Sequence, residues 1–221
     1  MIHTVILLWQ KYSYVYLEGL WGTLWLAALT VFFATIVGAL IAVMKLSKVK
    51  ILDFITAAYI SVIRGTPILL QLYFFWLILP RVLPITISDT ACIIIALIVN
   101  ASAYIAEVIR AGLQAVDQGQ AEAARSLGIS AYHTMKKIIL PQAIKNILPA
   151  LGNEYISMVK QTSLASVFFI QELMTSYKTV QAATFLAIPS LIIVGVIYFM
   201  VTSILSRGLE LYERNLRTNE R

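Results

Sequence analysis

Four ionisable side chains stand inside stretches of the sequence that are otherwise apolar. They are Arg64, Glu107, Glu154 and Lys160. A charged side chain at the centre of a bilayer costs about 2.5–3.5 kcal/mol on insertion scales, so such residues usually face a partner, a cavity or a ligand. Glu107 and Arg110, three residues apart at the cytoplasmic end of the third segment, are expected to form a structural pair. Arg64, Glu154 and Lys160 indicate a polar path or site at membrane depth, with structural pairing as the alternative.

Arg64 is followed closely by Gly65 and Pro67. Glycine tolerates unusual backbone angles and proline removes a hydrogen-bond donor, so a helix can open here and free backbone groups for a ligand. Broken helices near the membrane midplane are a recurring way to build polar solute sites. Two interpretations of Arg64 stay open: it receives the carboxylate of a substrate, or it forms a structural salt bridge, for instance to Glu154.

Glu154 lies in the fourth apolar segment, and Lys160 follows six residues later. A carboxylate that faces a water-filled cavity favours a cationic substrate. Asn100, Ser102 and Tyr104 on the third segment could add neutral hydrogen bonds. We therefore expect a basic amino acid as the substrate; the alternative is that Glu154 and Lys160 simply pair with other helices.

The composition requires a membrane around these residues. Of the 221 residues, 60% are hydrophobic and 13% are charged, whereas a soluble domain carries roughly 25% charged residues. The lysines and arginines are spread over separate segments, which excludes a nucleic-acid-binding face. Cys92 is the only cysteine, so we expect a small buried side chain and neither a disulfide framework nor a metal cluster.

Five apolar segments predict an all-α membrane protein with five transmembrane helices in a single domain, because each helix satisfies its own backbone in lipid. The expected spans are residues 20–44, 54–79, 90–112, 147–169 and 182–206. The first dozen residues, with Trp9 and Tyr12, suit a helix that lies at the outer membrane interface; a simple aromatic belt is the alternative.

The lysines and arginines predict the orientation of these spans. Twelve of the 17 fall on one side of the membrane and three on the other. The twelve are Lys45, Lys48, Lys50, Arg110, Arg125, Lys136, Lys137, Lys145, Arg207, Arg214, Arg217 and Arg221. Because basic residues favour the cytoplasmic side, we expect the N-terminus outside and the C-terminus in the cytoplasm.

The loop between spans three and four, residues 113–144, carries clear helix signals. Asp117 can cap a helix over residues 118–127, which Gly128 can end in the left-handed conformation. Ser130 can cap a second helix to Lys137, after which Pro141 should prevent simple continuation. Small alanines beside an expected Glu122–Arg125 pair should let another protein approach the first helix closely.

This loop carries a family resemblance. Glu122-Ala123-Ala124, then Gly128, then Ile138-x-Leu140-Pro141 resembles the "EAA" signature of ABC importer permeases at every position. The resemblance implies that the loop is the coupling helix, with Glu122, Ala123, Ala124, Arg125 and Gly128 fitting a cleft on a separate ATP-hydrolysing subunit.

Three further segments resemble the polar amino-acid branch of these permeases, of the histidine, glutamine and arginine type. They are residues 61–67 with Gln71, residues 100–112 and residues 159–164. Many members carry Asp or Ser where this chain has Gln161, which bears on substrate specificity. The resemblance implies substrate contacts at Arg64, Thr66, Asn100, Ser102, Tyr104, Glu154, Lys160 and Ser163, and a path or gate at Gly65, Pro67, Gln71, Met158, Gln161, Thr162 and Leu164; for Thr162 and Ser163 a purely structural role, bonding to nearby carbonyls, is the alternative.

The chain has no Walker loop among its ten glycines, so ATP and Mg²⁺ should be bound by a partner. We expect a non-enzymatic permease in the bacterial inner membrane, without a cofactor or metal of its own. The expected partners are two copies of the ATPase, a second identical or homologous permease, an external solute-binding protein, lipid and an amino-acid substrate. The alternatives are an ion-coupled secondary transporter, an ABC permease for glutamine or glutamate, and a membrane enzyme or respiratory subunit.

Overall fold

The computed structural model describes residues 1–47 and 49–218, and every regular element within them is helical. In order these are α1 (Ile2–Leu46), α2 (Lys50–Gly65), α3 (Ile68–Val82), α4 (Asp89–Gln114), α5 (Gln118–Ser126), α6 (Ala131–Thr134), the π-helical turn η1 (Met135–Ile139), α7 (Leu140–Gln161), the 3₁₀ helix η2 (Thr162–Phe168), α8 (Leu173–Thr184) and α9 (Ala187–Thr218). The predicted all-α class is confirmed for these residues. Lys48 and Arg221, counted above for orientation, and the side chain of Arg217 lie outside them.

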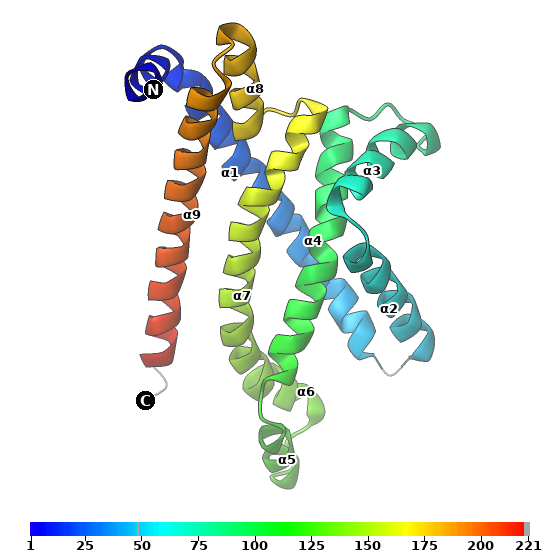
Figure 1. The fold of residues 1–221 in the computed structure, drawn as a ribbon. Coiled ribbons are helices and arrows are strands. Elements are labelled where there is room, and N and C mark those ends of the chain that lie inside the picture. Colours follow the sequence, from blue (N-terminus) through cyan, green and yellow to red (C-terminus); the bar gives the residue numbers. More distant parts are fainter. Residues whose placement is uncertain (48, 219–221) are drawn as a thin grey trace.

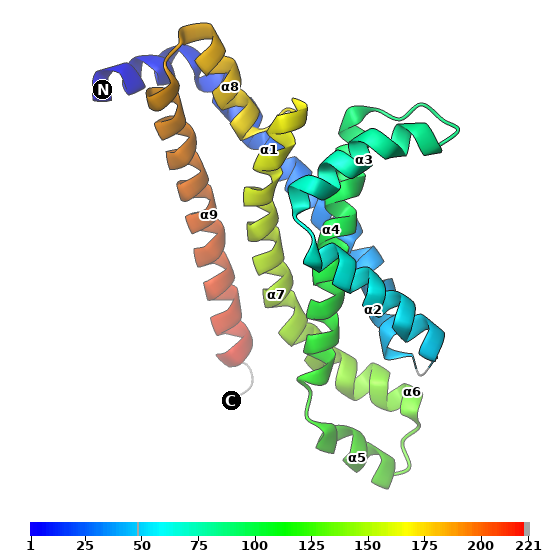
Figure 2. The same ribbon diagram turned by 45° about the vertical axis from the view of Figure 1, so that its right-hand side comes forward.

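α1 is much longer than the span predicted over residues 20–44, because the aromatic N-terminal segment continues the same helix. Its 45 residues extend about 68 Å, well beyond the thickness of a bilayer. At the start of α1, Leu8, Val15 and Tyr16 are buried against α8 and α9, and the Tyr16 hydroxyl lies 2.7 Å from that of Ser190. Figures 1 and 2 show this segment leaving the bundle at the end opposite α5.

The second predicted span, residues 54–79, is not one straight helix. α2 ends at Gly65 and α3 begins at Ile68, and the two helix axes differ in direction by 108°. Pro67 has no N–H to continue the helical ladder, and the residue before it, Thr66, has an extended backbone, as a following proline favours. The opening expected after Arg64 is thus confirmed, while the boundaries of the span are corrected.

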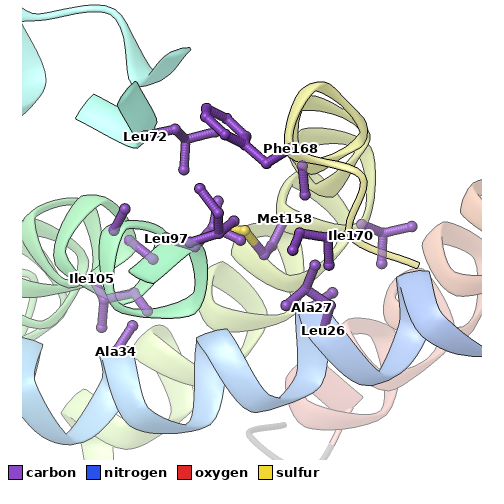
Figure 3. Close-up of a cluster of buried hydrophobic side chains, with 14 residues drawn as sticks. Leu26, Ala27, Ala34, Leu72, Leu97, Ile105, Met158, Phe168 and Ile170 are labelled. Atoms are coloured by element: carbon purple, nitrogen blue, oxygen red, sulfur yellow. The ribbon is translucent and has the colours of Figure 1, made fainter. Parts of the chain in front are cut away.

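The central core is formed where α1 crosses α4 and where α7 and α3 close over them. Figure 3 shows Ala27 and Ala34 of α1 facing Leu97 and Ile105 of α4, with Met158 of α7 pointing into the same cluster. Small residues on α1 allow the two helices to approach closely, which in lipid is the main source of packing energy.

The loop predicted over residues 113–144 projects from one end of the bundle (Figures 1 and 2). Its second helix was expected to stop before Pro141, and this prediction was wrong. α6, η1 and α7 follow one another without a break, because the π-helical turn moves the preceding carbonyls away from the proline ring. α7 therefore begins at Leu140 and reaches Gln161, and residues 162–168 continue as a 3₁₀ helix.

α8 was not predicted, and the last span begins at residue 187 rather than 182. The Glu172 carboxylate caps α8 by accepting the N–H groups of Met174 at 2.8 Å and Thr175 at 2.5 Å, and it also accepts the Tyr198 hydroxyl at 3.1 Å. Burial raises the pKa of the Glu172 carboxyl, while these donors lower it. The fully buried carboxylate thus ties α8 to α9.

Within residues 1–47 and 49–218, three helices are long and apolar enough to cross a membrane: α1, α4 and α9. The bent pair α2–α3 would add a fourth span if it is counted as one. The C-terminal end of α1, the N-terminal end of α2, the loop that carries α5 and the C-terminal end of α9 lie towards the same end of the molecule (Figure 1). The sequence predicts that this end faces the cytoplasm.

Gly38 of α1 provides a test of the core. A Cβ atom there would lie 3.0 Å from the Ser102 carbonyl oxygen and 3.1 Å from the Ala106 nitrogen on α4. We expect Gly38→Ala to separate α1 from α4 and to destabilise the protein by about 1–3 kcal/mol, as overpacking does, lowering the melting temperature of the detergent-solubilised protein. Gly195→Ala is the control, because nothing lies within 4 Å of that Cβ position; equal melting temperatures for the two variants would contradict the close crossing.

Candidate translocation site and coupling loop

The break between α2 and α3 is held together by one buried glutamine. The Gln71 Nε2 donates to the Ile63 carbonyl at 2.7 Å and to the Thr66 hydroxyl at 2.8 Å, with a longer 3.2 Å contact to the Thr66 carbonyl. Its Oε1 accepts a hydrogen bond from the Asn100 Nδ2 on α4 at 2.9 Å. A single side chain thus bonds to backbone groups on the α2 side of the break and anchors them to α4.

The Gln71 amide supplies hydrogen-bond donors that the interrupted helix lacks. Each unsatisfied backbone group at membrane depth costs several kcal/mol, and Gln71 replaces N–H groups missing around Pro67. Gln71 is 7% exposed and Asn100 is 3% exposed. Both side chains are therefore engaged within the protein, and the substrate contact expected for Asn100 and the path role expected for Gln71 stay predictions.

Arg64 lies directly before the break and contacts α4. Its guanidinium carbon lies 5.3 Å from the centre of the Tyr104 ring, and its Nη1 lies 3.9 Å from the Glu107 Oε2. The structural alternative for Arg64, a salt bridge within the protein, is present, but its partner is Glu107 rather than the Glu154 given as an example. The Arg64 side chain remains 45% exposed, so part of the guanidinium is accessible to a ligand.

Glu107 is the centre of a cluster of charges at the meeting point of α1, α2 and α4. Its carboxylate accepts hydrogen bonds from the Lys45 ammonium at 3.0 Å and from the Arg110 guanidinium at 2.7 Å, in addition to the longer ion pair with Arg64. The predicted pair between Glu107 and Arg110 is confirmed, whereas the contributions of Lys45 and Arg64 were not foreseen. Three cations share one carboxylate, so the cluster keeps an excess of positive charge.

A polar stripe runs along α7. Glu154, Ser157 and Gln161 are spaced by three and four residues, so they lie on one face of the helix. The Gln161 Nε2 donates to the Ser157 hydroxyl at 3.1 Å, and the Gln161 Oε1 is buried without a partner among the described residues. The carboxylate of Glu154 is half-buried and has no hydrogen bond or ion pair within the described part of the chain.

Three other predicted site residues are engaged by nearby groups. The Ser102 hydroxyl is buried and lies 2.7 Å from the Tyr59 hydroxyl. Thr162 and Ser163 donate to the carbonyls of Val159 at 2.9 Å and Lys160 at 2.7 Å, as the structural alternative expected. These bonds satisfy polar groups where α7 passes into η2.

Two predicted path residues are packed in the core. Met158 is 2% exposed, and Leu164 lies against the same cluster. The Lys160 side chain, by contrast, is exposed and forms no ion pair among the residues described. Of the residues expected around the path, Glu154, Lys160 and Arg64 are therefore those with charge still available.

α5 of the projecting loop begins and ends as the sequence predicted. The Asp117 Oδ1 accepts the N–H of Gly119 at 2.8 Å, and Gly128 ends the helix with a φ of 73°. The N–H of Gly128 donates to Arg125 and that of Ile129 to Ala124, both at 3.0 Å. These two bonds form a Schellman motif, which fixes the exit of the chain from α5.

The exposed surface of α5 differs in part from expectation. Glu122, Ala123 and Arg125 are exposed, whereas Ala124 is 2% exposed and faces inwards. Glu122 and Arg125 form no ion pair in the residues that the structure describes. Both charges are therefore free to meet a partner protein.

A cleft of about 790 Å³ separates α5 from the rest of the loop and from the bundle. One wall is formed by Ala121, Glu122 and Arg125 of α5, and the opposite wall by Met135 and Ile139 of η1. Leu46 at the end of α1 and Leu113 near the end of α4 also line it. Beside this cleft, α5 contacts α6 and η1 and buries Ala124.

Residues 34–218 match the family described as "Binding-protein-dependent transport system inner membrane component". The chain belongs to this family. It is 37% identical to the arginine transport system permease protein ArtQ of Bacillus subtilis, over 92% of this chain and 93% of that protein. It is 36% identical to a putative glutamine transport system permease protein GlnP of Rickettsia bellii, over 90% and 91%.

A solved structure described as an amino acid ABC transporter with histidines superposes with a TM-score of 0.90 at 43% identity, covering 95% of this chain and 97% of that one. The resemblance to ABC importer permeases of amino acids, drawn from the EAA signature, is thereby confirmed. So is the prediction that the chain is an inner membrane component.

Sequence reasoning missed several polar residues of this permease. Lys45 and Ser157 complete the charge cluster and the stripe, and Glu172 caps α8. The position of Ser157, between Glu154 and Gln161 at helical spacing, could have revealed the stripe. Nothing in the sequence connects Lys45 to Glu107, because 62 residues separate them.

Gln71 allows a test of the break in the permease. Gln71→Leu would leave the carbonyl of Ile63 and the Asn100 amide without their partners, and we expect a loss of about 1–3 kcal/mol for each buried group left unpaired, seen as a lower melting temperature in detergent. Gln10→Leu is the control, since Gln10 lies at an exposed position of α1, outside the break. If Gln71→Leu had the same melting temperature as the parent protein, this role of Gln71 would be refuted.

Proposed function

We propose that this chain is the five-span permease subunit of an ATP-driven importer for basic amino acids: arginine, lysine or histidine. Glu154 carries the choice of substrate. It is a half-buried carboxylate on a membrane helix, and it has neither a hydrogen bond nor an ion pair in the described residues. Such a group is costly unless a cation or water meets it.

The two ends of a basic amino acid match two opposite charges: the carboxylate of Glu154 and the guanidinium of Arg64, which is partly exposed although it pairs with Glu107. The cationic side chain would meet Glu154, and the α-carboxylate would meet the accessible part of Arg64. The ammonium of Lys160 and the hydroxyl of Tyr104 would lie at the margins of this site. The hydroxyls of Thr66 and Ser163 donate to the carbonyls of Val62 and Lys160, so towards a ligand they would act as acceptors. The arginine named for the Bacillus relative supports this choice, while the glutamine named for the Rickettsia relative supports the alternative of an uncharged substrate.

In the proposed topology, α1, the bent pair α2–α3, α4, α7 with η2, and α9 are the five spans. The N-terminus lies outside and α5 in the cytoplasm, because the lysine- and arginine-rich segments share the end that carries α5 (Figure 2). The aromatic first residues of α1 would then lie at the outer interface.

The proposed partners follow from what the chain contains. α5, with Glu122 and Arg125 exposed and Gly128 at its end, would dock into one of two ATPase subunits, which bind ATP and Mg²⁺. A second permease, identical or homologous, would complete the path, and an external solute-binding protein would deliver the amino acid. ATP binding would move α5 and thereby open the site alternately to the two sides.

The substrate is tested by uptake of labelled amino acids into proteoliposomes that contain the complete transporter. We expect arginine, lysine or histidine to be preferred over glutamine. Glu154→Gln should reduce uptake of the basic amino acid by about tenfold, which corresponds to roughly 1.4 kcal/mol. Glu18→Gln, at an exposed position of α1, is the matched control. A preference for glutamine, together with full activity of Glu154→Gln, would refute the basic substrate.

Docking of the ATPase is tested at α5. Gly128→Asp forces a side chain into a left-handed backbone position, and Glu122→Lys reverses an exposed charge. We expect both to insert normally but to lower substrate-stimulated ATP hydrolysis by about tenfold or to release the ATPase during purification. Gly208→Asp and Glu210→Lys on α9 are the controls; normal transport by both α5 variants would exclude the docking role.

A further inference from the structure

α6 and α7 are joined by a helical turn that is wider than an α-helix. Within η1, the N–H of Leu140 donates to the carbonyl of Met135, five residues back. A single π-helical turn of this kind amounts to one extra residue in the helix, and such turns are frequent at functional sites. One residue corresponds to about 100° of rotation about the helix axis, so η1 sets how α7 is turned relative to the coupling loop.

Pro141 and Gln142 account for this turn. In a regular α-helix, the ring of Pro141 would clash with the carbonyl of Lys137, which would also lack its N–H donor. The wider turn removes the clash, and the Gln142 Nε2 donates to the carbonyl of Ile138 at 2.9 Å. Proline alone does not have this effect, because Pro149 lies within α7 where the helix is regular.

The turn lies between the two parts of the permease that must communicate. On one side, Met135 and Ile139 of η1 line the 790 Å³ cleft whose other wall is α5. α5 also contacts η1 and α6 directly and buries Ala124, so a movement of α5 changes the packing around η1. On the other side, α7 carries Glu154 and Gln161 towards the site.

The far end of α7 is also irregular. Directly after Gln161 the chain forms η2, a 3₁₀ helix of seven residues, which is longer than such helices usually are. A 3₁₀ helix is tighter than an α-helix, and conversion between the two changes both the rotation and the length of a segment. α7 is thus a regular helix bounded by a wide turn at one end and a tight one at the other (Figure 1).

We propose that Pro141 is a positioning residue: it holds η1 as a hinge through which movement of α5 rotates α7 and repositions Glu154 and Gln161. This inference rests on the proposed function, because it concerns how the motor's movement reaches the substrate site. Pro141 contacts neither substrate nor nucleotide in this mechanism. Its effect is on the number of amino acids moved for each ATP hydrolysed.

The first experiment measures this ratio in proteoliposomes that contain the permease, its ATPase and its solute-binding protein. Pro141→Ala restores an N–H at this position, and deletion of the exposed Lys137 removes the extra residue of the turn. We expect both to lower the ratio of transport to ATP hydrolysis about fivefold or more, with hydrolysis itself changed less than about twofold. Pro149→Ala is the matched control and should keep the parental ratio; a parental ratio in Pro141→Ala would overturn the proposal.

The second experiment reports on the turn without transport activity. Spin labels are attached to cysteines introduced at Gln118 on α5 and at Asn153 on α7, both exposed, while the native Cys92 is buried. Electron–electron resonance on the purified permease should give a different distance distribution in Pro141→Ala than in the parent or in Pro149→Ala. Identical distributions would overturn the proposal.

The two experiments separate the possible failures. If the parental transporter moved no amino acid, the proposed function would fail, and the spin-label distances would still decide whether Pro141 sets the turn. If Pro141→Ala did not insert, Gln142→Leu would replace it, since it removes the donor to the Ile138 carbonyl. We expect Gln142→Leu to show the same shift in distance, and an unchanged distance would count against the hinge.

Discussion

The structure depends on one constraint: backbone groups inside a membrane must find hydrogen bonds within the protein. Most of this chain meets the constraint by being helical, but at Gly65–Pro67 the helix is interrupted. Gln71 of α3 supplies the missing donor there, and Asn100 of α4 donates to the Gln71 amide oxygen and holds that side chain in place. The interruption can therefore exist only because α4 passes beside it. Because α2 ends here, Arg64 lies at the end of a helix with part of its guanidinium exposed. In a continuous helix, Arg64 would lie in the helix interior instead of at its end.

The charged side chains also need partners within the protein, and these partners come from segments far apart in the sequence. Glu107 forms ion pairs with three cations, one each from α1, α2 and α4. These pairs lie near the end of the bundle that carries α5. Removing a charge from such a cluster would leave the others half-buried and unpaired, which costs more than the pairs contribute in themselves. Glu154, in contrast, has no hydrogen bond or ion pair among the described residues, although the charge of Arg64 acts on it. This difference from Glu107 is what the proposed substrate role of Glu154 rests on.

α7 connects these two regions. It begins at the coupling loop, carries the polar stripe, packs Met158 into the core (Figure 3) and ends beside η2. In the proposed mechanism, the π-helical turn and the 3₁₀ helix at its two ends would let α7 rotate against α1, α4 and α9, which it contacts. A helix that was regular from residue 131 to residue 168 would transmit force only by moving as a single rod.

Much of the permease could be predicted from the sequence because the signals are local. The apolar segments, the caps at Asp117 and Ser130, the left-handed Gly128 and the opening after Arg64 each depend on a few neighbouring residues, and these features are all present. Only the tertiary structure decided that Arg64 pairs with Glu107 rather than Glu154, that Ala124 faces inwards, and that Pro141 continues a helix. These outcomes depend on which side chains from distant segments meet, and on backbone turns whose energies differ little in isolation. A sequence pattern by itself does not show which of these side chains come into contact, because the contacts depend on how the helices pack.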